Sequence, residues 1–291
     1  MGKGKLAKFA EMARMECVYE FPYTHGEAMS CPLRGRWHDD VFHNANPIVL
    51  ELGCGRGEYT VGLARLNPDV NYIGVDIKGA RMWTGARQAE AECLRNVAFL
   101  RTNIEIIDHF FAPGEVSEIW LTFSDPQMKK VTKRLTGTAF IQRYRHFLAD
   151  GGLVHLKTDS NFLFTYTEEM LRANHITPLI STRHLYKDSI NSIDSIDSIN
   201  SIDSIDSIDP IDSKNPIASP TPTSPTSLLQ KARSIQTYYE GMWRSRGIDI
   251  KYMVFALHPT PSPLIEPEVE LPLDEYRSYN RDKRSEKETH I

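Results

Sequence analysis

The sequence predicts an α/β protein with a mostly parallel sheet of seven strands and helices on both faces. Apolar runs typical of buried strands alternate with segments of helical periodicity along most of the chain. The apolar runs are nearly continuous, as expected for strands that are covered on both faces. The length of 291 residues, with 41% hydrophobic and 25% charged residues, suits one globular domain with appendages and excludes collagen-like, coiled-coil and wholly disordered chains.

The predicted strands and helices follow one another at regular intervals. Strands are expected at 48–52, 71–77, 97–102, 118–124, 152–158, about 177–184 and 250–257. Helical patterns occupy 57–66, 79–95, 138–149, 160–174 and 228–246. Because ligands of such sheets bind at the carboxyl ends of the strands, we expect the chemistry just after positions 52, 77, 103, 124 and 158.

Composition divides the chain into four parts. An N-terminal helical or extended arm (1–45) precedes the main domain (46–187 and 228–259), which is interrupted by a low-complexity insertion (188–227). In the insertion, Ser-Ile-Asp or Ser-Ile-Asn repeats seven times before a Pro/Thr/Ser-rich stretch. A period of three fits neither a strand nor a helix, so we predict disorder there. The Pro-rich and then charged tail (260–291) is also predicted to be disordered.

Charge is unevenly distributed between these parts. The formal net charge is -4, but the insertion alone carries -6 and residues 263–291 carry -3, which leaves +5 on the rest. A basic main domain is compatible with a nucleic-acid partner and equally with an ordinary solvated surface. In the arm, Leu6, Phe9 and Met12 have helical apolar spacing beside several lysines, which favours a packed helix over an RNA-binding arm.

Cysteine usage and hydropathy predict the compartment. The four cysteines form no CxxC pair, which favours a reducing compartment with neither disulfides nor a metal site. No stretch approaches the ~18 apolar residues of a membrane span, and the N-terminus lacks the apolar core of a signal peptide. We therefore expect a cytoplasmic protein without membrane contact. Both a monomer and a homodimer are compatible with the sequence.

A glycine-rich loop follows the first predicted strand. Its glycines are Gly53, Gly55 and Gly57. The GxGxG spacing differs from the GxGxxG of dinucleotide sites, and Glu51 before it suits a cationic or amino-bearing ligand. Asp76 ends the second strand, where a carboxylate can accept hydrogen bonds from both hydroxyls of a ribose. Together these features favour a nucleoside ligand. Asn103, after the third strand, fits either a ligand contact or a helix N-cap.

Further polar residues follow the later strands. Asp125 ends the fourth strand and is followed by four basic residues, Lys129, Lys130, Lys133 and Arg134. An acid can accept from the donor edge of a base and cations can contact phosphates, whereas a turn with a solvated loop is the alternative interpretation. Asp159 fits a ligand contact or a helix N-cap. The Thr237–Glu240 segment has the T-x-x-E spacing of a capping box.

These motifs resemble those of the class I (Rossmann-like) S-adenosylmethionine-dependent methyltransferases, and most closely the bacterial tRNA (guanine-N7-)-methyltransferases. The resemblance covers nearly all of residues 46–258 apart from the insertion. It depends on ELGCGRGEY, NYIGVDIK, FSDP with a basic loop and KRL, GGLVHLKTD and TYYE. It implies transfer of a methyl group from S-adenosyl-L-methionine to N7 of a guanosine in tRNA, at position 46 in the variable loop.

The resemblance also implies a role for each motif residue. The implied cofactor group is Glu51, Gly53, Gly55, Gly57, Asp76, Asn103 and Asp125, with Asp125 also the catalytic residue. The implied substrate group is Lys129, Asp159, Thr237, Tyr238, Tyr239 and Glu240, with Lys130, Lys133 and Arg134 as weaker RNA contacts. The sequence departs from the family pattern at three places, which affect the basic loop more than the cofactor site. Gln127 replaces an aromatic residue, the basic loop is short and lacks a histidine, and Asn103 replaces an acid.

Other functions fit the sequence less well. Another class I RNA or small-molecule methyltransferase is the nearest alternative, although the SDPQ sequence does not match the DPPY-like pattern of enzymes that methylate adenine amino groups. An NAD-dependent oxidoreductase is opposed by the GxGxG spacing. A non-catalytic RNA-binding module is opposed by the intact glycine loop and its two acids.

Overall fold

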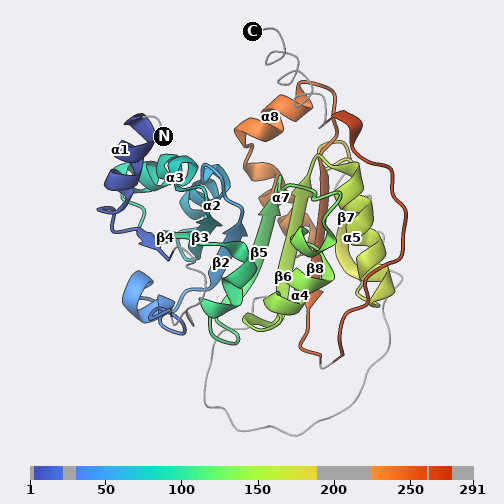
Figure 1. The fold of residues 1–291 in the computed structure, drawn as a ribbon, viewed down its shortest axis with the longest axis horizontal. Coiled ribbons are helices and arrows are strands. Elements are labelled where there is room, and N and C mark those ends of the chain that lie inside the picture. The colour runs from blue at the N-terminus through green and yellow to red at the C-terminus, as the bar shows by residue number, and fades with distance from the viewer. Residues whose placement is uncertain (1–2, 22–30, 189–223, 261, 277–291) are drawn as a thin grey trace, which may run out of the picture.

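One mixed sheet organises the molecule. The computed structural model describes residues 3–21, 31–188, 224–260 and 262–276. Within these ranges an 8-stranded sheet has the order β1-β4-β3-β2-β5-β6-β8-β7 (Figure 1). The strands are Val18–Glu20 (β1), Ile48–Leu52 (β2), Asn71–Asp76 (β3), Val97–Arg101 (β4), Val116–Thr122 (β5), Leu148–Thr158 (β6), Pro178–Thr182 (β7) and Lys251–Leu257 (β8). β8 is antiparallel to both β6 and β7, and the other neighbouring pairs are parallel. The predicted fold class is confirmed.

The N-terminal arm adds an eighth strand to the seven that were predicted. β1 pairs with β4 in parallel, with Val18 opposite Phe99. Before it, α1 (Lys3–Met12) packs against α3, where Met12 is buried and the Trp83 indole donates to Glu11 at 2.8 Å. The packed-helix interpretation of this segment is confirmed. A strand of three residues is too short to leave an alternating pattern, which is why the sequence did not predict it.

Helices cover both faces of the sheet, as predicted. One face carries α2 (Glu58–Leu66), α3 (Gly79–Ala91) and α7 (Pro225–Ser234), whose apolar side chains pack with those of Val49, Phe99, Trp120 and Val254. The other face carries α4 (Thr138–Tyr144), α5 (Asn161–Ala173), the π-helix η1 (Trp37–Phe42) and the 3-10 helix η2 (Ile104–His109), packed on Leu50, Ile73, Leu121 and Phe255. A further 3-10 turn, η3 (Val131–Lys133), lies in the basic loop.

The predicted helix at 228–246 is wrong as a single element. It forms two helices, α7 and α8 (Tyr238–Arg244), separated by extended backbone at Ile235 and Thr237. Thr237 is the N-cap of α8 and accepts the backbone N-H of Glu240 at 3.2 Å. Because an N-cap residue has non-helical backbone angles, the capping motif itself breaks the helix. α7 begins at Pro225, within the range predicted as insertion, and residues 189–223 lie outside the described part of the chain.

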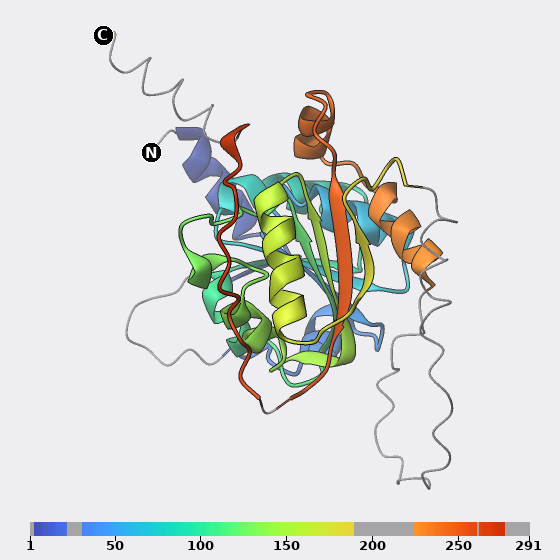
Figure 2. The same cartoon turned by 90° about the vertical axis from the view of Figure 1, so that its right-hand side faces the viewer.

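Part of the tail after Pro259 differs from the predicted disorder, and residues 277–291 lie outside the described ranges. Residues 262–276, which we term the strap, run along α5 (Figure 2). Glu266 accepts hydrogen bonds from Thr138 and Tyr166, both at 2.6 Å, and Asp274 accepts from the backbone N-H of Phe162 at 3.1 Å. Leu264 and Leu271 pack against the core, but prolines at 263, 267 and 272 interrupt the segment, so no helix or strand pattern predicts it. Carboxylates that accept from groups on α4 and α5 also hold it in place.

Candidate functional site

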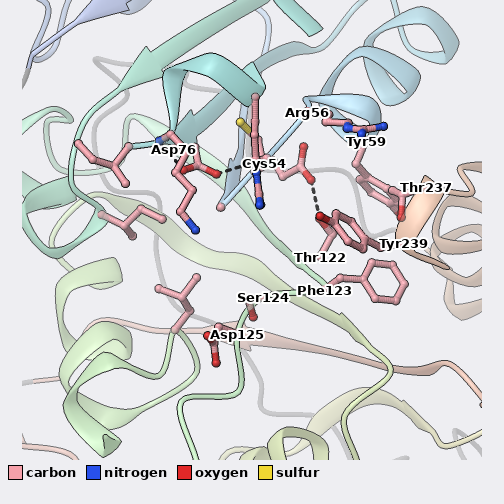
Figure 3. Close-up of a pocket in the computed structure, with 18 of the residues that line it drawn as sticks. Cys54, Arg56, Tyr59, Asp76, Thr122, Phe123, Ser124, Asp125, Thr237 and Tyr239 are labelled. Atoms are coloured by element: carbon pink, nitrogen blue, oxygen red, sulfur yellow. Dashed lines mark hydrogen bonds between the residues drawn. The ribbon is translucent and has the colours of Figure 1, made fainter. Parts of the chain in front are cut away.

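A cavity of about 680 Å³ opens at the carboxyl ends of β2, β3, β4 and β5 (Figure 3). Its volume lies within the roughly 300–1,000 Å³ of small-molecule sites. Ten of the predicted site residues line it: Glu51, Gly53, Gly55, Asp76, Asn103, Asp125, Lys130, Lys133, Thr237 and Tyr239. Six do not: Gly57, Lys129, Arg134, Asp159, Tyr238 and Glu240. The cavity lies at four of the five strand ends where ligands are expected, and the residues directly after position 158 do not line it.

The glycine loop places backbone close to the cavity. Gly53 has φ +85° and Gly55 has φ +56°, in the left-handed region that glycine adopts at little cost. The loop is held to β3, because Gly53 N-H donates to the Val75 carbonyl at 2.8 Å. Gly57 has a different function: a Cβ there would lie 2.7 Å from the Phe99 ring, so this glycine lets α2 pack closely on the sheet. The loop therefore leaves room for a ligand above Gly53 and Gly55.

Glu51 lies at the base of the cavity and is almost fully buried. One carboxylate oxygen accepts from the backbone N-H of Thr60 at 2.9 Å and from its hydroxyl at 2.5 Å, and the other accepts from the Thr122 hydroxyl. Burial raises the pKa of Glu51 to about 7, while these hydrogen bonds oppose the rise and the charge of Asp76 adds to it. A cation bound in the cavity would favour the ionised form.

Asp76 and Asn103 face the cavity from the ends of β3 and β4. The two oxygens of Asp76 accept backbone N-H groups of Gly55 at 3.0 Å and Lys78 at 2.8 Å, which fixes the carboxylate in place. Each oxygen has a further lone pair, so hydroxyl groups of a ligand can still donate to it. Asn103 accepts the backbone N-H of Glu105 at 3.1 Å as the N-cap of η2, and this cap does not use its amide nitrogen, a donor. Asn103 can therefore serve as the N-cap of η2 and contact a ligand at the same time.

The end of β5 is a strained turn. Phe123 has φ +51° and Gln127 has φ +46°, and neither is glycine. Such backbone costs about 1–3 kcal/mol per residue and persists where the surroundings impose it, often at functional sites. Asp125 lies between them, is exposed, and accepts the Gln127 N-H at 3.0 Å. The turn that Asp-Pro indicates is present as an Asx turn, and Asp125 lines the cavity (Figure 3).

The four basic residues of the loop after β5 differ in exposure and in their contacts. Lys129 and Lys130 are exposed, and Lys133 forms an exposed ion pair with Glu105 at 2.5 Å. Arg134 is buried, donates to the carbonyls of Gln127 at 3.2 Å and Met128 at 2.9 Å, and stacks over Phe162 and Tyr166. The prediction of Arg134 as an RNA contact is thus replaced by a structural function, because its guanidinium is engaged in holding the loop.

The Thr237–Glu240 segment divides between the cavity and the interior. Thr237 and Tyr239 line the cavity, whereas Tyr238 is exposed and stacks against Arg56 of the glycine loop, 5.1 Å from the ring centroid. Glu240 is fully buried, pairs with Lys157 at 2.8 Å and accepts from the Tyr186 hydroxyl. Only half of the capping box therefore forms, since the Glu240 carboxylate turns inward and does not reach back to Thr237.

Asp159 follows β6 and is fully buried by the strap. Its carboxylate accepts from the Tyr276 hydroxyl at 2.8 Å, and its carbonyl accepts from Lys251 at 2.8 Å. The N-cap of α5 is Ser160, which accepts the Leu163 N-H at 2.9 Å, so the capping function falls on the next residue along. In this arrangement Asp159 cannot meet a substrate unless Tyr276 moves.

Several residues that line the cavity were not predicted from the sequence. The principal ones are Thr122, Phe123, Tyr59, Arg81 and Trp243. Thr122 ends β5 two residues after Trp120, which lies opposite Glu51, so a polar residue directly after the apolar run 119–121 was a usable signal. Arg81 and Trp243 lie on helices. Which side of each helix faces the cavity depends on tertiary packing, and no local sequence pattern shows it.

We also searched the described residues for metal sites, disulfides and membrane-spanning helices. Within them, His, Cys, Asp and Glu side chains form no group of three or more that could hold a metal ion. All four cysteines are unpaired. No helix in the described ranges has both the length and the apolar character that crossing a membrane demands.

The sheet order and the cavity together define a class of protein. The order β4-β3-β2-β5-β6-β8-β7 with antiparallel β8, and a GxGxG loop after β2 facing an acid on β3, are those of a class I, Rossmann-like methyltransferase. Residues 45–201 match the methyltransferase family described as "Putative methyltransferase".

The chain belongs to the tRNA (guanine-N(7)-)-methyltransferase family. Relatives of that name from Bacteroides fragilis (strain YCH46) and Bacteroides thetaiotaomicron are each 52% identical over 285 residues, which is 98% of this chain and 98% of theirs. The relative of the same name from Porphyromonas gingivalis (strain W83) is 46% identical over 272 residues, 92% of this chain and 96% of its own. The resemblance read from the motifs is confirmed.

Proposed function

We propose that the protein transfers a methyl group from S-adenosyl-L-methionine to N7 of a guanosine in tRNA. The observation that carries this proposal is the joint placement of Glu51, Asp76, Asn103 and Asp125 around one cavity. The names of the relatives support tRNA as substrate. The resemblance of the motifs supports position 46 of the variable loop as the target, and the tRNA substrate supports action in the cytoplasm.

The donor set fits this cofactor. Glu51 can pair with the ammonium of the methionine portion, Asp76 can accept from the ribose hydroxyls, and Asn103 can donate to the adenine edge. The open space above Gly53 and Gly55 admits the chain that joins these parts, since a Cβ at Gly53 meets no atom within 4 Å. When bound, the cofactor supplies an electrophilic methyl group on a sulfonium.

Guanine N7 carries an in-plane lone pair, so its attack on that carbon requires no general base. The protein's principal contribution is alignment, and holding reacting groups in line can lower the barrier by ~7–11 kcal/mol. Methylation leaves the purine cationic. A carboxylate that accepts from guanine N1-H and the exocyclic amino group stabilises this charge, and Asp125 is exposed beside the cavity to do so.

The decisive experiment identifies the product. Purified protein is incubated with unmodified tRNA and methyl-labelled S-adenosyl-L-methionine, the RNA is digested to nucleosides, and the labelled one is identified by mass spectrometry. We expect 7-methylguanosine. A different labelled nucleoside would favour the activity of another class I RNA methyltransferase. Cofactor binding without any labelled nucleoside would contradict the proposal that tRNA is the substrate.

The assignment of Asp125 has its own test. Asp125→Ala is expected to lower turnover at least 100-fold while the Kd for tRNA changes less than threefold, because the carboxylate acts mainly on the charge that develops in the reaction. Asp150→Ala, at an exposed carboxylate paired only with exposed His258 in the described structure, is the matched control. Equal losses of turnover and binding would remove the catalytic role.

A further inference from the structure

A buried lysine connects three elements behind the cavity. Lys157, near the end of β6, is fully buried, and its ammonium contacts the Ala232 carbonyl at 2.7 Å, the Ile235 carbonyl at 2.9 Å and a Glu240 carboxylate oxygen at 2.8 Å. The two carbonyls accept hydrogen bonds from the ammonium, Glu240 forms an ion pair with it, and the Tyr186 hydroxyl lies 3.4 Å away. They belong to the end of α7, to the segment between the helices and to the first turn of α8.

The first two contacts hold the end of α7. Ala232 is one of the last four residues of α7, whose carbonyls have no partner within the helix, and Ile235 is the C-cap that follows its last residue. A cation at this position also interacts favourably with the helix dipole. Lys157 therefore acts as a C-cap supplied from the sheet, and it fixes where α7 stops.

The third contact holds the start of α8. Because Glu240 is fully buried and also accepts from the Tyr186 hydroxyl, α8 is anchored by its first turn. Together with Ala232 and Ile235, this anchor encloses a short stretch of chain. We term residues 235–240 the junction.

The junction reaches the cavity from the side opposite Asp76. Thr237 and Tyr239 line the cavity, and the Tyr238 N-H donates to Glu58 at 2.8 Å, at the start of α2. Figure 3 shows Thr237 and Tyr239 beside Tyr59 and Arg56. The exposed face of the junction carries two tyrosines, which are suited to stacking on nucleobases.

We propose that Lys157 is a positioning residue, which fixes the junction so that Thr237 and Tyr239 hold the acceptor nucleoside over the cavity. This inference rests on the proposed function. Lys157 is fully buried and does not line the cavity, so it acts through the junction. A buried ion pair contributes little net stability compared with an apolar pair of similar size, but it defines one geometry, because each charge must find its partner.

The test separates positioning from stability. Lys157→Met removes the charge at similar volume, and we expect KM for tRNA to rise at least tenfold and kcat to fall, with the Kd for S-adenosyl-L-methionine within twofold of wild type. Hydrogen exchange of residues 235–241 should become faster, while exchange in β2 and β3 stays unchanged. Glu240→Gln keeps the fold with a neutral side chain of the same shape and should show the same changes to a smaller degree.

The double variant Lys157→Met/Glu240→Leu decides between the two roles. It buries no unpaired charge, so we expect it to recover the Tm of wild type but not the KM for tRNA. Recovery of both would show that the pair serves stability alone and would overturn the proposal, as would an unchanged KM in Lys157→Met.

The control variant for Lys157→Met is Lys231→Met, and the activity of the wild-type enzyme is measured first. Lys231→Met removes the ion pair between α7 and Glu118 of β5, at 2.7 Å and outside the junction, and should leave KM within twofold. Wild-type enzyme is first shown to form 7-methylguanosine. Failure of that step concerns the proposed function, whereas a normal wild type with an unaffected Lys157→Met refutes the positioning role.

Discussion

The buried carboxyl of Glu51 predicts that cofactor affinity depends on pH. Its pKa is raised to about 7 by burial, so it ionises near neutrality, and only the carboxylate can pair with the ammonium of S-adenosyl-L-methionine. With a pKa near 7, about half of the molecules are ionised at pH 7 and roughly one in thirty at pH 5.5. The apparent Kd should therefore be about 16-fold higher at pH 5.5 than at pH 7.

Isothermal titration calorimetry between pH 5.5 and pH 7 measures this dependence while the amino group of the ligand, whose pKa is roughly 8, stays protonated. Glu51→Gln is the control variant, because a neutral amide should bind weakly and equally at every pH in this range. A wild-type Kd that varies less than twofold, or a variant that keeps the wild-type slope, would refute the ion pair.

The same group affects the stability of the cofactor-free protein. A carboxyl whose pKa is raised on folding favours the folded state below its unfolded value of 4.5, and that contribution is lost as pH rises through about 7. At pH 8 the ionised carboxylate costs about 3 kcal/mol. Glu51→Gln should therefore raise the free energy of unfolding in urea at pH 8, and the gain should vanish toward pH 4.5.

The remaining predictions concern the loop and the strap. Lys129→Ala should weaken tRNA binding and reduce the slope of log Kd against log salt by about 0.7–0.9, as measured by filter binding; an unchanged slope would remove Lys129 from the phosphate contacts. Arg134→Lys should release the loop, because one ammonium cannot replace two guanidinium hydrogen bonds and two ring contacts, and proteolysis at Lys129 and Lys130 should become faster than in wild type. Asp274→Ala should lower the free energy of unfolding by about 1–3 kcal/mol, since it leaves the Phe162 N-H without its acceptor, whereas Glu270→Ala, at an exposed position, should not.

The strands and the meeting of Glu51, Asp76 and Asn103 at one cavity could be predicted because both follow from local pattern. Buried parallel strands leave continuous apolar runs, and parallel strands bring their carboxyl ends together, so Glu51, Asp76 and Asn103 had to converge once the strands were placed. The glycine spacing then limited the ligand.

The surroundings of Asp159 and Glu240 could not be predicted to the same depth, because they depend on contacts between distant segments. Asp159 is covered by Tyr276, 117 residues further along the chain, and Glu240 is drawn inward by Lys157 of β6. Neither pairing leaves a periodic signal. The division of α7 from α8 was within reach, because the T-x-x-E spacing at Thr237 already marked a helix start.

The position of β8 between β6 and β7 has a consequence for the order of folding during synthesis. β7 pairs only with β8 in the described sheet, yet the ribosome completes β7 at Thr182 and β8 at Leu257, 75 residues later. At roughly 5–20 residues per second, β7 waits about 4–15 s for its partner. Every Ser-Ile-Asp unit inserted between these two strands lengthens the wait, so the repeat number is coupled to how long the backbone N-H and C=O groups of β6 that pair with β8 stay unpaired in the nascent chain.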